Sequence, residues 1–295
     1  MKRILLTGGS GFIGKNILEG LQEKYEFSCP SSKELDLLDT EAVQEYLKKN
    51  SFDVVIHAAN RNDFRQQLSA YEVLNGNLQM YFNLERCSEL YGKMLYFGSG
   101  AEYDRRNNVS NIVEDCFDIS IPRDAYGLSK YVMAKSCINS CNIYELCLFG
   151  IYGKYEEWER RFISNAICRA LEGLDITIKK NVFFDYLWVE DCVRLLPYFI
   201  ENDLKYKRYN VCRGVKIDLY TLATIVRDIV GVNCKIRVGE SGLKREYTGN
   251  NSRMMKGIGK FKFTDVTESI EELCGYYQKH LNLIDVNRLR MYSDL

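Results

Sequence analysis

Histidine and proline are scarce in this 295-residue sequence, which contains two histidines and three prolines. Because His57 and His280 are the only histidines, few histidine-based mechanisms of acid–base catalysis are open to the chain. With so few prolines and no low-complexity tract, no stretch stands out as a linker. Any second domain must therefore be woven into the first by long connections.

The sequence also lacks net charge, since 40 lysines and arginines balance 40 aspartates and glutamates. This balance predicts no polybasic surface for nucleic acid or anionic lipid. The 11 cysteines form no CxxC pair and no zinc-like Cys/His cluster, so we predict reduced thiols, no disulfide framework and no metal site. The first apolar run is too short for a signal peptide or membrane span, and we expect a cytoplasmic protein.

A glycine-rich stretch, TGGSGFIG at positions 7–14, lies between a short apolar run and a pattern of apolar residues with helical spacing. Gly8 permits a tight turn, Gly11 lets the backbone approach a pyrophosphate, and Gly14 lets the helix pack on the strand. The N-terminus of the helix, near Phe12 and Ile13, supplies free N–H groups and the positive end of its dipole. We therefore predict that these five residues bind a dinucleotide cofactor.

Apolar strands and amphipathic helices alternate along the first part of the chain. Strands are predicted at 25–29, 53–60, 93–103 and 144–153, with helices at 40–48 and 78–90. This alternation predicts an α/β fold with a Rossmann-like, doubly wound parallel sheet. We predict a Rossmann domain at 1–150, with returning segments near 182–200, and a smaller interwoven α/β substrate-binding region at 151–295.

The stretch DAYGLSKYVMAKS, at positions 124–136, places Tyr126 four residues before Lys130. On a helix these two side chains share one face. The phenol of tyrosine has a pKa of about 10, so it is a poor acid–base group at neutral pH unless a nearby positive charge stabilises the phenolate. Lys130 and a bound nicotinamide would supply that charge. Ser99, at the end of a predicted strand, is a candidate third partner that would hold a substrate oxygen.

The TGGSGFIG motif resembles the extended short-chain dehydrogenase/reductases, the NAD-dependent epimerase/dehydratase family that modifies nucleotide sugars. The resemblance implies that Ser99, Tyr126 and Lys130 form the catalytic triad, that Lys130 also binds the nicotinamide ribose, and that the protein is a homodimer. The stretch SSKELDLLDTEAVQEYL is similar to GDP-fucose synthases, and the stretch HAAN is similar to the corresponding segment of this family. They imply cofactor contacts by Asp39, Ala58 and Ala59.

The same resemblance implies where a nucleotide-sugar substrate binds. The implied substrate contacts are Ser99, Arg161, Asn165 and Arg253. The family's arginine before Asp185 is absent, because Phe184 stands there. The role of that missing arginine in binding the diphosphate would pass to other arginines.

The choice of nicotinamide cofactor depends on the residues after the second strand. Enzymes that use NAD usually place an acid there, to bind the ribose 2′-hydroxyl. Here the stretch reads CPSSK at 29–33, and Ser32 with Lys33 could meet a 2′-phosphate. We therefore favour NADP(H), with NAD(H) as the alternative.

Departures from the family pattern narrow the reaction. Family dehydratases carry two acids directly after the serine, whereas Gly100 and Ala101 follow Ser99 here. Ala101 and Arg161 stand where GDP-fucose synthases carry the cysteine and histidine of their epimerase step. We predict NAD(P)H-dependent reduction of a 4-keto-6-deoxy nucleotide sugar at C4, for surface-polysaccharide synthesis. The alternatives are a 4-epimerase with tightly bound NAD and a silent cofactor-binding protein.

Overall fold

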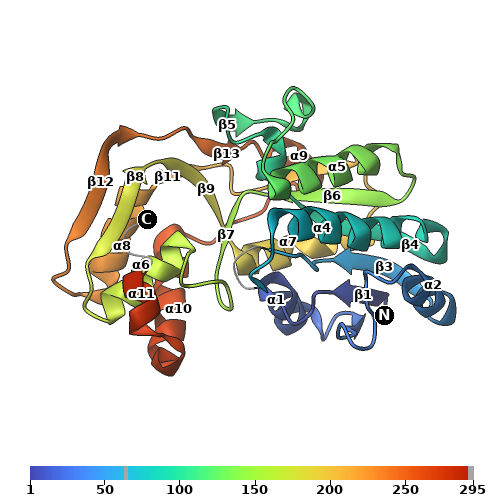
Figure 1. Ribbon diagram of the computed structural model, residues 1–295, viewed down its shortest axis with the longest axis horizontal. Coiled ribbons are helices and arrows are strands. Elements are labelled where there is room, and N and C mark those ends of the chain that lie inside the picture. The colour runs from blue at the N-terminus through green and yellow to red at the C-terminus, as the bar shows by residue number, and fades with distance from the viewer. Residues whose placement is uncertain (63–65, 292–295) are drawn as a thin grey trace.

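The computed structural model describes residues 1–62 and 66–291, which form a larger and a smaller lobe (Figure 1). The larger lobe contains the N-terminal strands and most of the first 150 residues. The smaller lobe contains the C-terminal helices (Figure 1). A wide cavity, described below, is lined by residues of both lobes.

A parallel sheet of six strands forms the centre of the larger lobe, with the order β10-β6-β4-β3-β1-β2. Its strands are β1 (Arg3–Thr7), β2 (Glu26–Ser28), β3 (Phe52–His57), β4 (Tyr91–Ser99), β6 (Ile143–Leu148) and β10 (Arg208–Val211). The prediction of a Rossmann-like parallel sheet is confirmed. Since all the strands run in the same direction, their carboxyl ends, including Thr7, His57 and Ser99, lie along one edge of the sheet.

Helices cover both faces of this sheet (Figure 1). They are α1 (Phe12–Leu21) and α7 (Val189–Glu201) on one face, and α2 (Thr40–Lys49), α4 (Ala70–Glu85) and α5 (Ala125–Asn139) on the other. Alternation along β1 explains the two cores, because Ile4 and Leu6 pack with α1 and α7 whereas Leu5 packs with α2 and α4. A parallel strand that is covered on both faces needs apolar residues on both sides, as Ile4, Leu5 and Leu6 of β1 provide.

The smaller lobe combines short strands with helices that pack on them. Its strands are β5 (Val109–Ile112), β7 (Gly150–Tyr152), β8 (Ile176–Asn181), β9 (Phe183–Trp188), β11 (Lys216–Asp218), β12 (Ile236–Leu243) and β13 (Tyr247–Gly249), and its helices are α6 (Phe162–Leu171), α8 (Leu219–Val230), α10 (Val266–Lys279) and α11 (Val286–Met291). One sheet has the order β11-β9-β13-β5, with β7 beside β9, and β12 pairs with β8. Ile167, Leu222 and Leu273 are fully buried in the separate core of this lobe.

The remaining elements are short. They are α9 (Ser252–Ile258) and the 3-10 turns η1 (Ser88–Leu90), η2 (Gly100–Tyr103), η3 (Glu114–Cys116) and η4 (Leu281–Leu283). Met254 of α9 is buried in the core between α1, α7 and the large sheet. Thus α7, β10 and α9, which all follow residue 188, complete the larger lobe.

No helix within the described residues combines the length and the apolar character needed to cross a lipid bilayer.

Candidate functional site

The glycine turn between β1 and α1 lies so close to neighbouring backbone that a side chain on Gly8 or Gly14 would clash with it. Gly8 has a φ of +72°, and a Cβ on it would lie 2.6 Å from the Ala59 nitrogen. A Cβ on Gly14 would lie 2.2 Å from the Gly8 oxygen. Gly11 begins helix α1 without a side-chain cap. Within the described residues, the first turn of α1 therefore keeps open N–H groups and a glycine cradle, which fit the pyrophosphate of a dinucleotide.

This turn opens into a cavity of about 1790 Å³ that runs along the carboxyl edge of the large sheet and into the smaller lobe. Among its lining residues are Gly8, Gly11, Phe12, Ile13, Ser32, Ala58, Ala59, Ser99, Tyr126, Lys130, Arg161 and Asn165. Most of the residues predicted to bind cofactor or substrate therefore line one continuous space. A single continuous space of this kind allows a bound dinucleotide and a second ligand to meet.

Tyr126 and Lys130 occupy one helix, as predicted, because Asp124 caps the N-terminus of α5. The Asp124 carboxylate accepts a hydrogen bond of 2.8 Å from the Gly127 N–H. Lys130 is 6% exposed, and its Nζ lies 5.7 Å from the centroid of the Tyr126 ring. The ammonium of Lys130 thus places a positive charge close to the Tyr126 ring.

Ser99 is the last residue of β4 and lines the same cavity. Its Oγ accepts a hydrogen bond of 3.2 Å from the Ala101 N–H, which fixes the hydroxyl at the start of η2. A serine hydroxyl that accepts one hydrogen bond still carries a proton that it can donate to another oxygen. The site thus offers a fixed hydroxyl, a phenol and an ammonium.

His57 lies close to this site, yet its chemistry is that of a neutral group. Burial, together with the charge of Lys130, lowers the pKa of His57 to about 3. Its Nδ1 hydrogen-bonds with the Thr7 hydroxyl at 2.8 Å. A histidine that stays neutral throughout the physiological range does not serve as the acid–base group here.

Most of the chain matches a known protein family. Residues 4–212 match the model of the NAD dependent epimerase/dehydratase family. The chain belongs to this family. It is 27% identical to the GDP-L-colitose synthase of Yersinia pseudotuberculosis over 95% of the chain and 99% of that protein. It is 22% identical to the GDP-6-deoxy-D-talose 4-dehydrogenase of Aggregatibacter actinomycetemcomitans, over 92% of the chain and 96% of that protein.

The epimerase/dehydratase fold of the chain is also evident among solved structures. A GDP-L-fucose synthetase from Naegleria fowleri bound to NADP superimposes with a TM-score of 0.81 at 18% identity, over 95% of each chain. At this level of identity the likeness shows the fold alone. The fold and the glycine cradle together indicate a nicotinamide dinucleotide as the cofactor of this family member.

The turn after β2 differs in part from the prediction for the adenosine end of the cofactor. Ser32 lines the cavity, whereas Lys33 is exposed and is not among the lining residues. Glu34 does line it, and its carboxylate accepts hydrogen bonds from the Ser31 N–H (2.7 Å) and hydroxyl (2.8 Å). These bonds lower the pKa of Glu34, which keeps it ionised. Sequence reasoning overlooked this acid because it follows the strand by six positions.

Asp39 does not line the cavity. Its carboxylate caps helix α2 by accepting hydrogen bonds from the Glu41 and Ala42 N–H groups at 2.9 and 3.0 Å. Asp36 lines the cavity in its neighbourhood. The contact between Asp39 and adenine that the resemblance implies stays a prediction.

The predicted substrate residues divide into two groups. Arg161, at the start of α6, and Asn165 line the cavity, and the Asn165 amide donates to the Glu159 carbonyl at 3.0 Å. Arg253 does not line it, because its guanidinium pairs with Asp115 at 2.5 Å and lies 3.6 Å from Glu114. Arg253 therefore lies outside the lining residues, and its contact with the diphosphate stays a prediction. Its place in the sequence resembled the family, but two acids before α5 bind it instead.

Several basic residues that the sequence did not single out also line the cavity. They are Arg105, Lys179, Lys180, Lys244 and Arg245. Strands β8 and β12 and the approach to β13 bring most of them together from distant parts of the chain. No local motif could have indicated them, because their proximity depends on the pairing of β12 with β8.

Glu156 is a further lining residue that sequence reasoning missed. It is 3% exposed, and its carboxylate accepts a hydrogen bond from the Ser164 hydroxyl. Its second oxygen is buried without a hydrogen-bond partner among the described residues. Burial raises the pKa of Glu156 to about 7, against the smaller opposing effects of Ser164 and Arg161.

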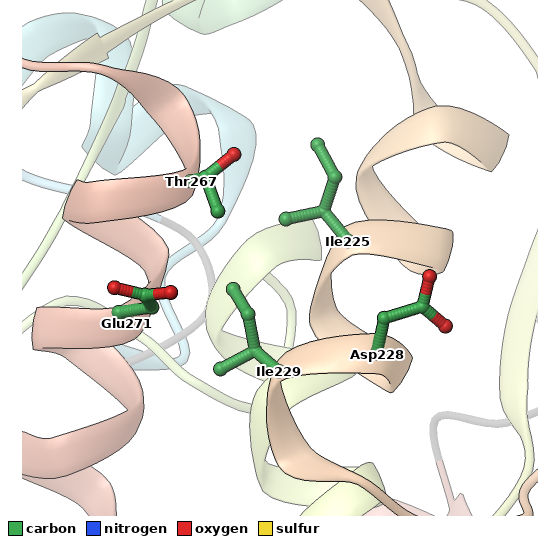
Figure 2. A pocket seen from close by; sticks show the side chains of 5 residues that line it. All are labelled: Ile225, Asp228, Ile229, Thr267 and Glu271. Atoms are coloured by element: carbon green, nitrogen blue, oxygen red, sulfur yellow. The ribbon is translucent and has the colours of Figure 1, made fainter.

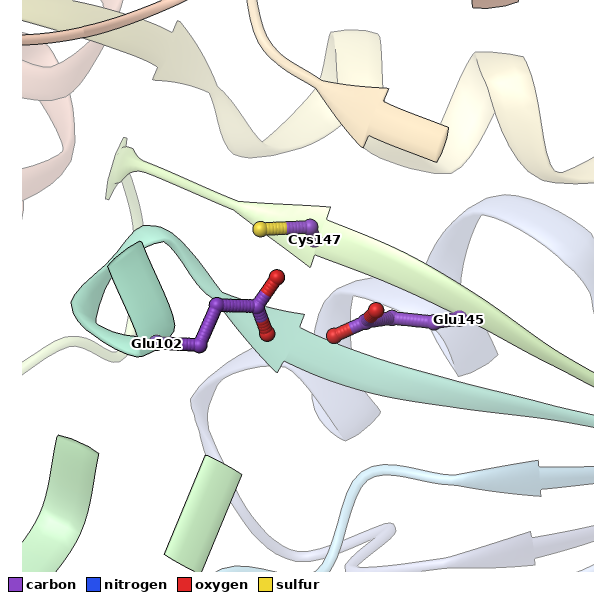
Figure 3. A group of neighbouring side chains, drawn as sticks. All are labelled: Glu102, Glu145 and Cys147. Carbon is purple, nitrogen blue, oxygen red and sulfur yellow. The ribbon is translucent and has the colours of Figure 1, made fainter. Parts of the chain in front are cut away.

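Glu102, Glu145 and Cys147 form a buried cluster beside β4 and β6 (Figure 3). The Arg208 guanidinium pairs with both carboxylates, so the positive charge beside them comes from an arginine side chain. A Cβ on Gly98 would lie 1.9 Å from a Glu145 oxygen, which explains the glycine just before Ser99. This cluster holds the end of β4 in place, and we assign it no ligand.

A second, smaller pocket lies between α8 and α10 (Figure 2). Ile225 and Ile229 of α8 face Thr267 and Glu271 of α10 across it, with Asp228 at its side. It is distant in the chain from the family motifs and we assign it no function.

Proposed function

We propose that this protein reduces a 4-keto-6-deoxy nucleotide sugar at C4 with NAD(P)H, in the cytoplasm, for surface-polysaccharide synthesis. The observation that carries the proposal is that Ser99, Tyr126 and Lys130 line the same cavity as the glycine turn. That arrangement brings a proton donor, an oxygen-binding hydroxyl and a cofactor cradle to one space.

The names of the two similar proteins support the substrate class. One is a GDP-L-colitose synthase, and the other is a 4-dehydrogenase of a GDP-linked 6-deoxy sugar. We therefore propose GDP as the nucleotide and position 4 of the sugar as the reacting carbon. Arg161, Lys179, Lys244 and Arg245 are the cavity residues that would face the diphosphate.

The roles of the side chains follow from their chemistry. When bound, the nicotinamide supplies the hydride that reaches the carbonyl carbon. Ser99 donates a hydrogen bond to the carbonyl oxygen, and Tyr126 gives its phenolic proton to that oxygen as negative charge develops on it. Lys130 stabilises the phenolate that remains.

We propose NADP(H) as the cofactor, supported by the Ser31–Ser32 hydroxyls at the adenosine end and by the NADP in the Naegleria structure. Glu34 is the group that opposes this choice, since its carboxylate would repel a 2′-phosphate. Titration of the purified protein with NADPH and with NADH tests the proposal. Tighter binding of NADH would overturn it in favour of NAD(H).

The test of the reaction is NADPH consumption with a panel of 4-keto-6-deoxy nucleotide sugars carrying GDP, UDP or dTDP. We expect turnover with a GDP-linked member and a loss of about 10²- to 10⁴-fold in Tyr126→Phe. A tyrosine variant with near-wild-type turnover would refute the mechanism. Tightly retained NAD without net consumption would indicate the 4-epimerase, and bound cofactor without turnover of any sugar would indicate a cofactor-binding protein.

The proposal includes a homodimer formed through α4 and α5. These helices pack side by side, and they carry exposed apolar side chains, Tyr71 at 73% and Ile138 at 43% exposure. Sedimentation equilibrium of the wild type and of Ile138→Glu tests it. A wild-type protein that sediments as a monomer would remove this part of the proposal.

A further inference from the structure

A second tyrosine, Tyr247, reaches the catalytic triad from the smaller lobe. It is the first residue of β13, which pairs with Val109 of β5 and with Phe184 of β9. Its ring lies 5.3 Å from that of Phe149 and 5.7 Å from that of Phe184, measured between centroids. Strand pairing and these two rings fix its direction, which is toward the large sheet.

The hydroxyl of Tyr247 lies beside Ser99 and lines the same cavity. A Cβ placed on Gly100, the residue directly after Ser99, would be only 2.6 Å from this oxygen. The phenol interacts with the Ser99 hydroxyl, and it is close enough to Tyr126 and Arg105 for their charges to act on it. Glycine at position 100 is therefore the residue that makes room for this phenol.

We propose that Tyr247 contacts the sugar together with Ser99 and so holds the reacting carbon in register with the cofactor. This inference rests on the proposed function, since it concerns the substrate of that same site. Phenylalanine at this position would make the same ring contacts with Phe149 and Phe184. Ring packing therefore does not account for the hydroxyl, which interacts with Ser99 and belongs to a residue that lines the cavity.

The chemistry of this phenol differs from that of Tyr126. Burial raises the pKa of Tyr247 well above its usual value, against smaller opposing effects of Ser99 and Arg105. It therefore remains a neutral hydrogen-bond donor throughout the working pH range. Tyr247 positions a sugar oxygen, while the proton that the reaction consumes comes from Tyr126.

The chain provides a matched control in Tyr103, which also contacts Phe149, with 6.2 Å between the ring centroids. Its hydroxyl donates to the Asn210 side chain at 2.9 Å, and Tyr103 is not among the residues that line the cavity. Tyr247→Phe and Tyr103→Phe therefore each remove a phenolic oxygen, from two tyrosines that both contact Phe149. Only the first removal affects the cavity.

The experiment compares both variants with the wild type in three measurements. These are kcat and KM with the 4-keto sugar that the wild type reduces, the Kd of NADPH, and the Kd of GDP-mannose by calorimetry with NADPH present. For Tyr247→Phe we expect kcat/KM to fall about 10- to 100-fold and GDP-mannose to bind several-fold more weakly. The Kd of NADPH and the pH at which the rate is half-maximal stay unchanged, because the proton donor is intact.

Three results would overturn the assignment of Tyr247. They are wild-type kcat/KM and sugar-nucleotide affinity in Tyr247→Phe, an equal loss in Tyr103→Phe, and loss of NADPH binding in Tyr247→Phe. The last would mean that the phenol supports the fold. If the wild type reduces no sugar of the panel yet binds GDP-mannose more tightly than Tyr247→Phe does, the proposed reaction fails and the contact stands.

Discussion

The Lys130 ammonium donates a hydrogen bond of 2.8 Å to the Phe97 carbonyl. This bond joins helix α5 to β4 two residues before Ser99, so the helix that carries Tyr126 and the strand that carries Ser99 are fixed to each other. Lys130 thus has two roles in this geometry, since it sets the charge beside Tyr126 and holds the two elements in register.

Replacing Lys130 with methionine should cost activity far more than it costs stability. The Lys130→Met variant loses the charge that we propose acts on Tyr126 during proton transfer, and we expect kcat to fall by about 10²- to 10⁴-fold. Its free energy of unfolding should fall by only about 1–3 kcal/mol, for the Phe97 carbonyl left without its donor. Steady-state kinetics and urea denaturation measure the two effects, and a variant with wild-type kcat would contradict the assignment.

Removing the charge of Glu34 should favour NADPH specifically. In Glu34→Gln, a 2′-phosphate near Ser31 and Ser32 no longer meets a carboxylate, so we expect NADPH to bind about 3- to 10-fold more tightly. Because Glu34 is exposed, the gain should shrink at high salt. Glu23→Gln, an exposed acid outside the cavity lining, is the control. An equal gain for NADH and NADPH would show that Glu34 does not face the 2′ position.

Adding one methyl group at Gly14 should damage cofactor binding and the fold together. A Cβ there would lie 2.2 Å from the Gly8 oxygen, a backbone atom that cannot swing aside as a flexible side chain would. For Gly14→Ala we expect a loss of about 1–3 kcal/mol in the free energy of unfolding and NADPH binding weakened by about tenfold or more.

The matched control for this substitution is Gly275→Ala in the middle of α10. No atom lies within 4 Å of its added Cβ. Since alanine is the better helix former, this variant should gain about 0.5–1 kcal/mol. Thermal denaturation of both variants separates a steric effect from an effect of alanine itself.

Glu156 should make stability depend on pH between about 4.5 and 7. Its pKa is raised from 4.5 to about 7 in the fold, so the folded state holds this proton more tightly than the unfolded chain does. The stabilisation is complete below pH 4.5 and is lost as the pH rises through 7.

Glu156→Gln keeps an acceptor for Ser164 and cannot ionise. It should exceed the wild type in stability by up to about 3 kcal/mol near pH 8 and by little near pH 5. Parallel pH curves for the two proteins would contradict this.

The buried pair of acids beside β4 should depend on its arginine. In Arg208→Met, Glu102 and Glu145 lose their shared cation in a dry environment, and we expect a loss of about 3–5 kcal/mol in stability. Arg237→Met, which breaks an exposed pair with Asp175, should cost at most about 1 kcal/mol. Urea denaturation of both tests this, and equal losses would mean that burial of the cluster has no energetic consequence.

Local patterns predicted the parts of the site that local geometry builds. Gly8, Gly11 and Gly14 lie within one turn, and four positions separate Tyr126 from Lys130 on one helix. Periodicity also predicted the alternation that builds the large sheet. In each case the pattern itself spans only a short stretch of sequence, so a short motif carries the information.

The rest depended on contacts between distant segments. Tyr247 reaches Ser99 only because β13 pairs with β5 and β9, and nothing near position 247 indicates this. Arg253 fitted a family pattern, but Asp115, which lies 138 positions earlier, binds it. A sequence pattern gives the kind of side chain, and only the fold determines which partner that side chain meets.

The position of β10 at the edge of the large sheet has a consequence for how the protein emerges from the ribosome. Since β10 ends at Val211, the six-stranded sheet cannot be complete until more than two thirds of the chain has been synthesised. By then the strands from β7 to β9 and helix α6 have already emerged. A nascent chain that is released near residue 150 would expose the edge of β6, an unpaired strand open to aggregation. The larger lobe therefore cannot be completed before part of the smaller lobe has been synthesised.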